Sequence, residues 1–134
     1  MTFRTLLVIK ALVCLVFGVF CLLAPASLLG ALGASLGAGG MFTAREYGAA
    51  LIGTLLLTWL AKGVTASDAR RAILLDLMVY DAIGVVITLL AVLSGVLNTL
   101  GWTIVVVYGF FAVGAGYLLV GEKPSRRAHT PTGA

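Results

Sequence analysis

Two carboxylic acids, Asp76 and Asp81, and one lysine, Lys10, lie inside long apolar stretches of the sequence. Ionisable side chains in such surroundings are costly to bury, and they commonly form ion pairs, proton relays or ion sites. On an α-helix a separation of five residues turns the side chain by about 140°, so Asp76 and Asp81 point to different neighbours. We therefore do not expect these two carboxylates to hold one metal ion or to act as a catalytic pair.

Lys10 and Asp76 are predicted to form an ion pair between two helices. If Arg4 and Arg71 mark the cytoplasmic edges of their helices, Lys10 lies about 9 Å deep and Asp76 about 7 Å deep. Opposite charges at matching depth compensate each other. The alternative for Lys10 is that its long side chain extends back to the near interface.

Asp81 is expected about 15 Å deep, near the midplane of a bilayer. Gly84, on the same helix face, would let another helix approach closely. Without a cation nearby, a carboxyl group at this depth should be largely protonated, and it could then donate a structural hydrogen bond. A proton or cation site and a face for a partner subunit are left open. Three side chains are candidate partners at similar depth: Thr54, Thr58 and Tyr108. Arg45 is a further candidate if its side chain reaches inward.

The other reactive residue types indicate no further chemistry. Cys14 and Cys21 would lie roughly 10 Å apart along a helix, which is too far for a disulfide. The single histidine, His129, falls in the tail, so the sequence predicts no haem, zinc or iron-sulfur ligand set and no Ser-His-Asp arrangement. We expect no catalytic residue, no metal and no cofactor, and we leave a bound lipid or quinone open.

Long apolar helices must position these residues. The chain of 134 residues is 61% hydrophobic and 10% charged, with a mean hydropathy of +1.15. A helix needs about 20 apolar residues to cross a bilayer, and in lipid only helices and closed barrels satisfy the backbone. Pro25 predicts a break near the outer end of the first helix. Four segments have suitable length, at approximately 5–29, 42–61, 72–93 and 101–120.

The predicted fold is therefore all-α, a polytopic four-transmembrane-helix bundle over residues 1–121. Residues 122–134 are predicted to form a polar cytoplasmic tail. Basic residues are retained on the cytoplasmic side of membrane proteins, which predicts that both termini are cytoplasmic, with Arg45 alone on the other side. The cytoplasmic side would then hold eight of the nine basic side chains: Arg4, Lys10, Lys62, Arg70, Arg71, Lys123, Arg126 and Arg127.

Small residues predict where the helices touch. Ala49 with Gly53, and Ala112 with Gly116, are spaced like the small residues of helix contact faces. Residues 30–40, GALGASLGAGG, contain five glycines and no charge. They lack the strand and the lysine of a phosphate-binding loop, so we interpret them as a connector.

Three stretches carry a resemblance to known proteins: AREYGAALIGTLLLTWLA (44–61), RRAILLDLMVYDAIG (70–84) and SGVLNTLGW (94–102). Through them the chain resembles uncharacterised small bacterial four-helix integral membrane proteins. The resemblance implies a four-helix membrane fold and no particular activity.

These observations favour a multi-pass protein of the bacterial inner membrane. The leading hypothesis is a non-enzymatic accessory or scaffolding subunit that contacts membrane lipids and either other membrane subunits or copies of itself. The alternative is a small proton-coupled transporter or channel that uses Asp81, and a third option is a lipid or quinone site between helices. The net charge of +4 fits loops near anionic headgroups, so no nucleic-acid partner is expected.

Overall fold

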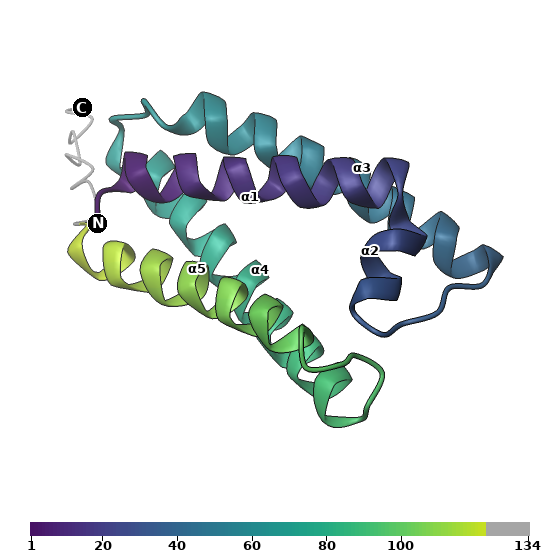
Figure 1. Cartoon of the computed structure of the whole chain (residues 1–134). Helices are drawn as coiled ribbons and strands as arrows, with labels where there is room; N and C mark the ends of the chain where they lie inside the picture. The colour runs from purple at the N-terminus through teal and green to yellow at the C-terminus, as the bar shows by residue number, and fades with distance from the viewer. Residues whose placement is uncertain (123–134) are drawn as a thin grey trace, which may run out of the picture.

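The computed structural model of the chain describes residues 1–122, which form five α-helices and no strand (Figure 1). The helices are α1 (Phe3–Leu23), α2 (Pro25–Ala31), α3 (Ala38–Ala61), α4 (Ser67–Leu93) and α5 (Gly101–Gly121). The all-α prediction is confirmed for this part of the chain. The predicted tail, including His129, lies outside the described residues apart from Glu122.

Three of the helices, α1, α4 and α5, are long and apolar enough to cross a membrane. Their 21, 27 and 21 residues correspond to about 31, 40 and 31 Å of helix. The chain therefore has the helices of a membrane protein, as its composition predicts. The fourth long helix, α3, carries Arg45 and Glu46 in its first half and is not among these candidate spans.

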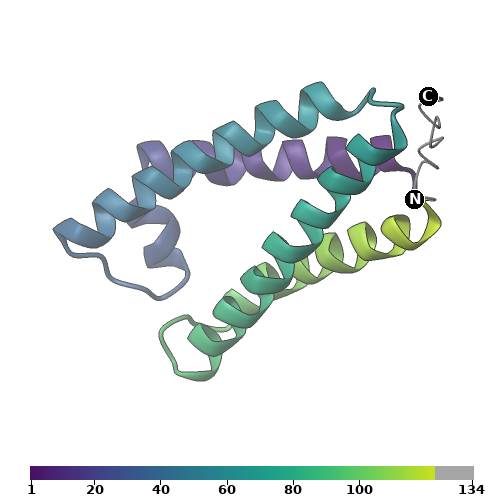
Figure 2. The same cartoon turned by 180° about the vertical axis from the view of Figure 1, so that it is seen from behind.

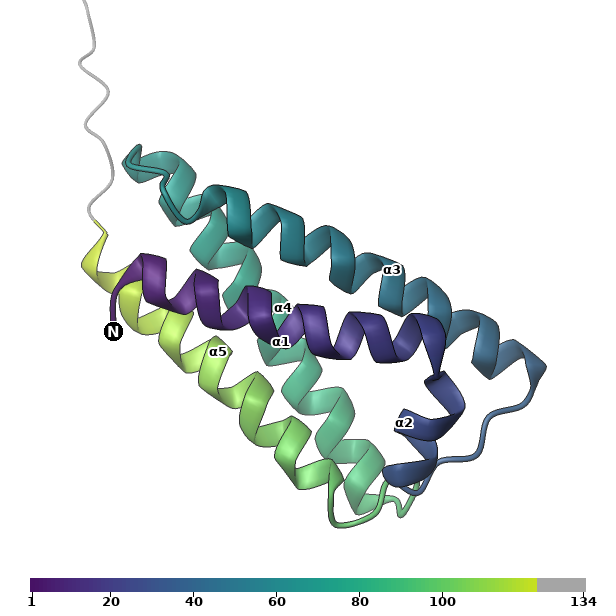
Figure 3. The same cartoon turned by 45° about the horizontal axis from the view of Figure 1, so that its top comes forward.

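The predicted first helix, 5–29, is wrong beyond residue 23. α1 ends at Leu23, and α2 begins with Pro25 at its first turn. A proline disfavours helical geometry in the residue before it, and Ala24 accordingly has φ −140° and ψ 53°. Proline is well suited to the first position of a new helix. The predicted break is therefore a corner, after which α2 turns away from the axis of α1 (Figure 3).

The long helices form two hairpins, α1 with α3 and α4 with α5, and the two hairpins diverge like the sides of a wedge (Figures 1 and 2). The N-terminus, the α3–α4 connection and the end of α5 lie together at one end, which we call the closed end. α1 contacts α5 only sparsely. The helices thus do not pack evenly along their length, as the predicted bundle would.

Buried side chains from both hairpins fill the closed end. They form one apolar cluster: Phe3, Leu6, Leu7, Ala61, Leu74, Leu77, Phe111 and Ala115. Above this cluster, Arg70 donates through Nε to Oε1 of Glu122 at 2.6 Å, and Arg71 donates to the backbone carbonyl of Glu122. The Arg70 guanidinium also lies 4.4 Å from the centre of the Phe3 ring. The start of α4 is thereby tied both to the end of α5 and to the start of α1.

The opposite, open end is joined by Asn98, in the connection between α4 and α5. Its backbone N–H donates to the carbonyl of Leu32 at 2.7 Å, and its side-chain amide donates to the carbonyl of Ala31 at 2.9 Å. Gly33 next to them has φ +88°, and a Cβ on it would lie 3.1 Å from the Asn98 Cβ. Only glycine fits this turn without strain, so the connector is a specific docking point for Asn98.

Candidate functional site

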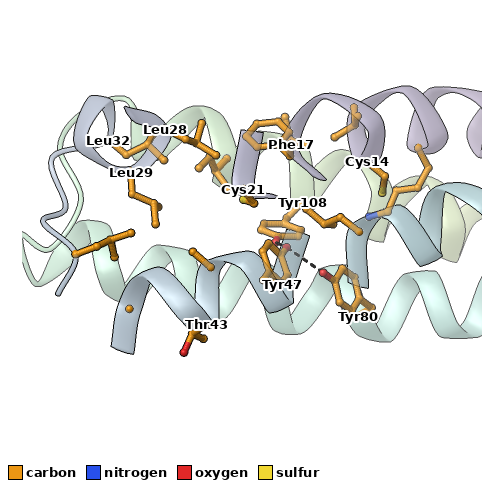
Figure 4. Close-up of a pocket in the computed structure, with 18 residues that line it drawn as sticks. Cys14, Phe17, Cys21, Leu28, Leu29, Leu32, Thr43, Tyr47, Tyr80 and Tyr108 are labelled. Atoms are coloured by element: carbon orange, nitrogen blue, oxygen red, sulfur yellow. Dashed lines mark hydrogen bonds between the residues drawn. The ribbon is translucent and has the colours of Figure 1, made fainter. Parts of the chain in front are cut away.

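A cavity of about 490 Å³, here called the wedge cavity, lies between the two hairpins. This volume is within the usual range for small-molecule sites. One wall contains Cys14, Phe17 and Cys21 of α1 and leucines of α2, and another contains Tyr80 and Tyr108 of α4 and α5 (Figure 4). The lining is mostly apolar. Its polar side chains are Lys10, Thr43 and three tyrosines, Tyr47, Tyr80 and Tyr108. Figure 4 shows the tyrosines away from Leu28, Leu29 and Leu32.

Lys10 forms a salt bridge with Asp81, and both side chains are buried, with 4% and 0% of their surface exposed. The predicted pair of Lys10 with Asp76 is wrong, because Asp76 is exposed. Leu74, Leu77 and Asp81 are all buried and follow the i, i+3, i+7 spacing of one helix face. Asp76 lies off that face. Matching depth was a poor guide because α4 crosses α1 obliquely (Figure 2).

The ammonium of Lys10 is surrounded by aromatic rings. Its Nζ lies 4.5 Å from the ring centre of Phe111, 5.2 Å from that of Tyr80 and 5.9 Å from that of Tyr108. Ring faces attract a cation at such distances. On the Asp81 carboxylate, Oδ1 accepts from Lys10, whereas Oδ2 is buried without a hydrogen-bond partner among the described residues. The pair therefore has hydrogen-bonding capacity left on both sides.

Three tyrosine hydroxyls meet across the wedge. The hydroxyl of Tyr47, from α3, lies 2.9 Å from that of Tyr80 and 2.6 Å from that of Tyr108. The rings of Tyr80 and Tyr108 are in edge contact, with 6.3 Å between their centres. All three side chains line the wedge cavity (Figure 4). We call this group the tyrosine trio; like the ion pair, it joins one hairpin to the other.

The predicted partners of Asp81 have other contacts. Thr54 donates to the carbonyl of Ala50 at 3.1 Å, and the fully buried Thr58 donates to the carbonyl of Thr54 at 2.8 Å. These are hydrogen bonds within α3, and they satisfy each hydroxyl locally. Arg45 is exposed. Tyr108 belongs to the tyrosine trio.

Gly84 lies directly against Tyr108, since a Cβ on it would lie 2.7 Å from ring atoms of that residue. Gly116 faces Met78, at 3.4 Å from its sulfur, and its neighbour on the same face, Ala112, is half-buried. These small residues therefore lie within the α4/α5 hairpin.

The predicted contact face of α3 meets no other helix of the described chain. Ala49 is exposed, and a Cβ on Gly53 would meet nothing within 4 Å. The close approach occurs instead at Gly48 and Gly18, where a Cβ on Gly48 would lie 2.9 Å from the backbone N of Leu22 and 3.0 Å from the backbone O of Gly18. Gly48, the residue before Ala49, is therefore the one that faces α1.

Several cavity residues were not singled out by the sequence analysis. Tyr47 and Tyr80 are not predicted as site residues, and Cys14 and Cys21 are predicted only to form no disulfide; both cysteines are buried free thiols. A signal was present, because Lys10, Cys14 and Cys21 follow the spacing of one helix face in an otherwise uniform apolar run. No equivalent pattern links Tyr47 to the other tyrosines.

Within residues 1–122, no three Cys, His, Asp or Glu side chains converge as metal ligands would. Comparisons with protein-family models, with curated proteins and with solved structures find no match to this chain. We therefore infer function from the geometry of the wedge.

Proposed function

We propose that this chain is a small, non-enzymatic accessory protein of the bacterial cytoplasmic membrane, and that it holds the apolar chain of a lipid-like molecule in the wedge cavity. The observation that carries the proposal is the cavity itself, which is mostly apolar and has Lys10 and three tyrosines apart from the leucines of α2. From Lys10 to Cys21 it follows about 16 Å of α1. A ligand of matching form has a hydrocarbon chain and a small polar head.

The proposal includes four membrane crossings with both termini in the cytoplasm. α3 packs antiparallel along α1, so a membrane crossed by α1 has α3 at the same depth. Four basic residues, Arg4, Lys62, Arg70 and Arg71, belong to the closed end, and cytoplasmic loops are enriched in such residues. The wedge cavity would then open toward the outer half of the bilayer.

Cysteine accessibility tests this orientation. Thr65 and Thr99 are exposed in the α3–α4 and α4–α5 connections. With an impermeant maleimide on intact cells, we expect Thr99→Cys to react and Thr65→Cys to react only after lysis. Labelling of Thr65→Cys on intact cells would overturn the orientation.

A photoreactive alkyl-chain probe tests the binding proposal. Cross-links on purified protein should saturate and map to residues lining the wedge cavity. Val13 lines the cavity, and Val16 is exposed on the same helix. We expect Val13→Trp to abolish the saturable labelling and Val16→Trp to leave it unchanged. Labelling that never saturates, or that is insensitive to Val13→Trp, would contradict the proposal.

The accessory role is supported by the exposed small residues Ala49 and Gly53 on α3, since small residues allow close helix contacts in membranes. It predicts co-purification with a larger membrane complex under mild detergent. Proton-coupled transport through Asp81 has less support, because Asp81 is paired with Lys10 and does not line the wedge cavity. If Asp81→Asn folds normally but no longer transports a substrate that the unchanged protein transports, the transport function would be favoured instead.

A further inference from the structure

We infer that the wedge cavity recognises its occupant by a neutral carbonyl head, that of a quinone or an ester attached to an apolar chain. The inference rests on the proposed function, because it names the head group of the same lipid-like ligand. Three observations on the polar end of the cavity carry it: the tyrosine trio, the surroundings of Lys10, and the charge balance of the ion pair.

The tyrosine trio has one O–H more than its own hydrogen bonds use. Each tyrosine hydroxyl supplies one proton, so the trio has three. Its two internal hydrogen bonds, Tyr47 with Tyr80 and Tyr47 with Tyr108, consume two of them. The third hydroxyl proton has one remaining contact within the trio, that between the hydroxyls of Tyr80 and Tyr108, which is weaker than the two hydrogen bonds to Tyr47. That proton can therefore turn to an acceptor in the cavity. The cavity wall therefore offers a hydrogen-bond donor.

Lys10 adds further donors at the same end. Its ammonium has three N–H groups, of which Asp81 accepts through Oδ1. The nearest aromatic partners, Phe111, Tyr80 and Tyr108, present ring faces within 6 Å. Whereas the hydroxyl of Thr43, which also lines the cavity, donates to the carbonyl of Gly39, the trio and Lys10 thus both have donors to spare. An acceptor on the ligand fits them, whereas a head without an acceptor gains nothing there.

The charge balance favours a neutral acceptor. Lys10 and Asp81 together carry no net charge, and Oδ2 of Asp81 is already buried without a partner. A carboxylate head would place a second negative charge beside this one with a single cation between them. Like charges in a poorly solvated site repel strongly. A carbonyl accepts the same hydrogen bonds without that cost.

Binding of four probes with the same ten-carbon chain tests the inference: a decyl benzoquinone, methyl decanoate, decanoate at neutral pH, and decane. The measurement is how well each one displaces the photoreactive alkyl probe from the purified protein. We expect at least one carbonyl probe to bind about tenfold more tightly than decane, as one added hydrogen bond allows, and decanoate to bind no better than decane. The two carbonyl arms distinguish a quinone from an ester lipid.

A matched set of tyrosine variants assigns the effect to the trio. Tyr47→Phe/Tyr80→Phe/Tyr108→Phe keeps the rings and removes all three hydroxyls, whereas Tyr117→Phe changes the fourth tyrosine, which is exposed outside the cavity. We expect the triple variant to lose the tenfold preference while it binds decane as before, which also shows that the cavity is intact. Tyr117→Phe should retain the preference.

Two results would overturn the inference while leaving the proposed function standing. One is decanoate binding as tightly as the carbonyl probes, and the other is a triple variant that keeps the preference. If none of the four probes displaces the alkyl probe, the proposed function fails together with the inference. These failures are therefore distinguishable in one experiment.

Discussion

At the closed end of the wedge, eight buried side chains from four helices pack the two hairpins together, whereas at the open end Asn98 joins them by two hydrogen bonds to the chain around Leu32. Packing of this kind contributes several kcal/mol in total, but a hydrogen bond contributes only about 1 kcal/mol net. The two hairpins are thus held firmly at the closed end and weakly at the open end, where we call the contact of Asn98 with Ala31 and Leu32 the latch. A ligand that enters between the hairpins would need to release only the latch.

The ion pair at the inner limit of the wedge cavity has the largest predicted effect. Removal of one partner of a buried pair costs about 3–5 kcal/mol, because the other charge is left uncompensated. We expect Lys10→Met and Asp81→Leu each to destabilise the protein by this amount, and the double variant to recover most of the loss. Thermal unfolding in detergent measures all three variants.

Asp76→Leu is the matched control, since Asp76 is an exposed carboxylate on the same helix. Its effect should stay within about 0.5 kcal/mol. The assigned pairing would be wrong if the stability lost in the double variant equalled the sum of the losses in the two single variants. It would also be wrong if Asp76→Leu cost as much stability as Asp81→Leu.

A pair of identical substitutions compares the packing of the two ends. Leu6 is fully buried in the closed-end cluster, whereas Leu29 is a half-buried leucine of the cavity wall. Truncation of a buried leucine to alanine costs about 2–5 kcal/mol, depending on the cavity left behind. We expect Leu6→Ala to cost an amount in that range and Leu29→Ala less than about 1 kcal/mol, both measured by unfolding. Equal costs would remove the distinction between the two ends.

The hairpin α1/α3 is predicted to remain tightly packed where the wedge is open. A side chain on Gly48 would meet the backbone of α1, whereas Gly53 faces open space. Overpacking of this kind costs about 1–3 kcal/mol. Gly48→Leu should lose stability by that amount and Gly53→Leu should not. If Gly53→Leu instead disrupts co-purification with a partner while the chain stays folded, the accessory role gains support.

The helices of this fold were predictable, and the wedge was not. Long apolar runs and Pro25 indicate the helices and the corner because those signals are local. The buried face of α4, through Leu74, Leu77 and Asp81, was also present in the sequence as a helical spacing. The prediction instead paired Lys10 with Asp76, because depths counted along each helix can be compared only if the helices are parallel. Tyr47 reaches Tyr80 and Tyr108 only at one angle between the hairpins, and no local pattern specifies that angle.

The latch has the smallest predicted effect on stability and the most specific effect on dynamics. Asn98→Ala removes the amide N–H that donates to Ala31 and the side-chain oxygen that accepts from the backbone N–H of Leu100, but it keeps the backbone bond to Leu32. The free energy of unfolding should therefore change by about 1–2 kcal/mol. Hydrogen exchange of α2, Pro25–Ala31, should nevertheless become faster, while exchange in the first turns of α1 and α4 stays unchanged, since local opening requires less energy than global unfolding. Thr99→Ala, an exposed neighbour, is the control. Faster exchange at both ends of the wedge would mean that the two hairpins separate as a whole. The open end would then not open independently of the closed end.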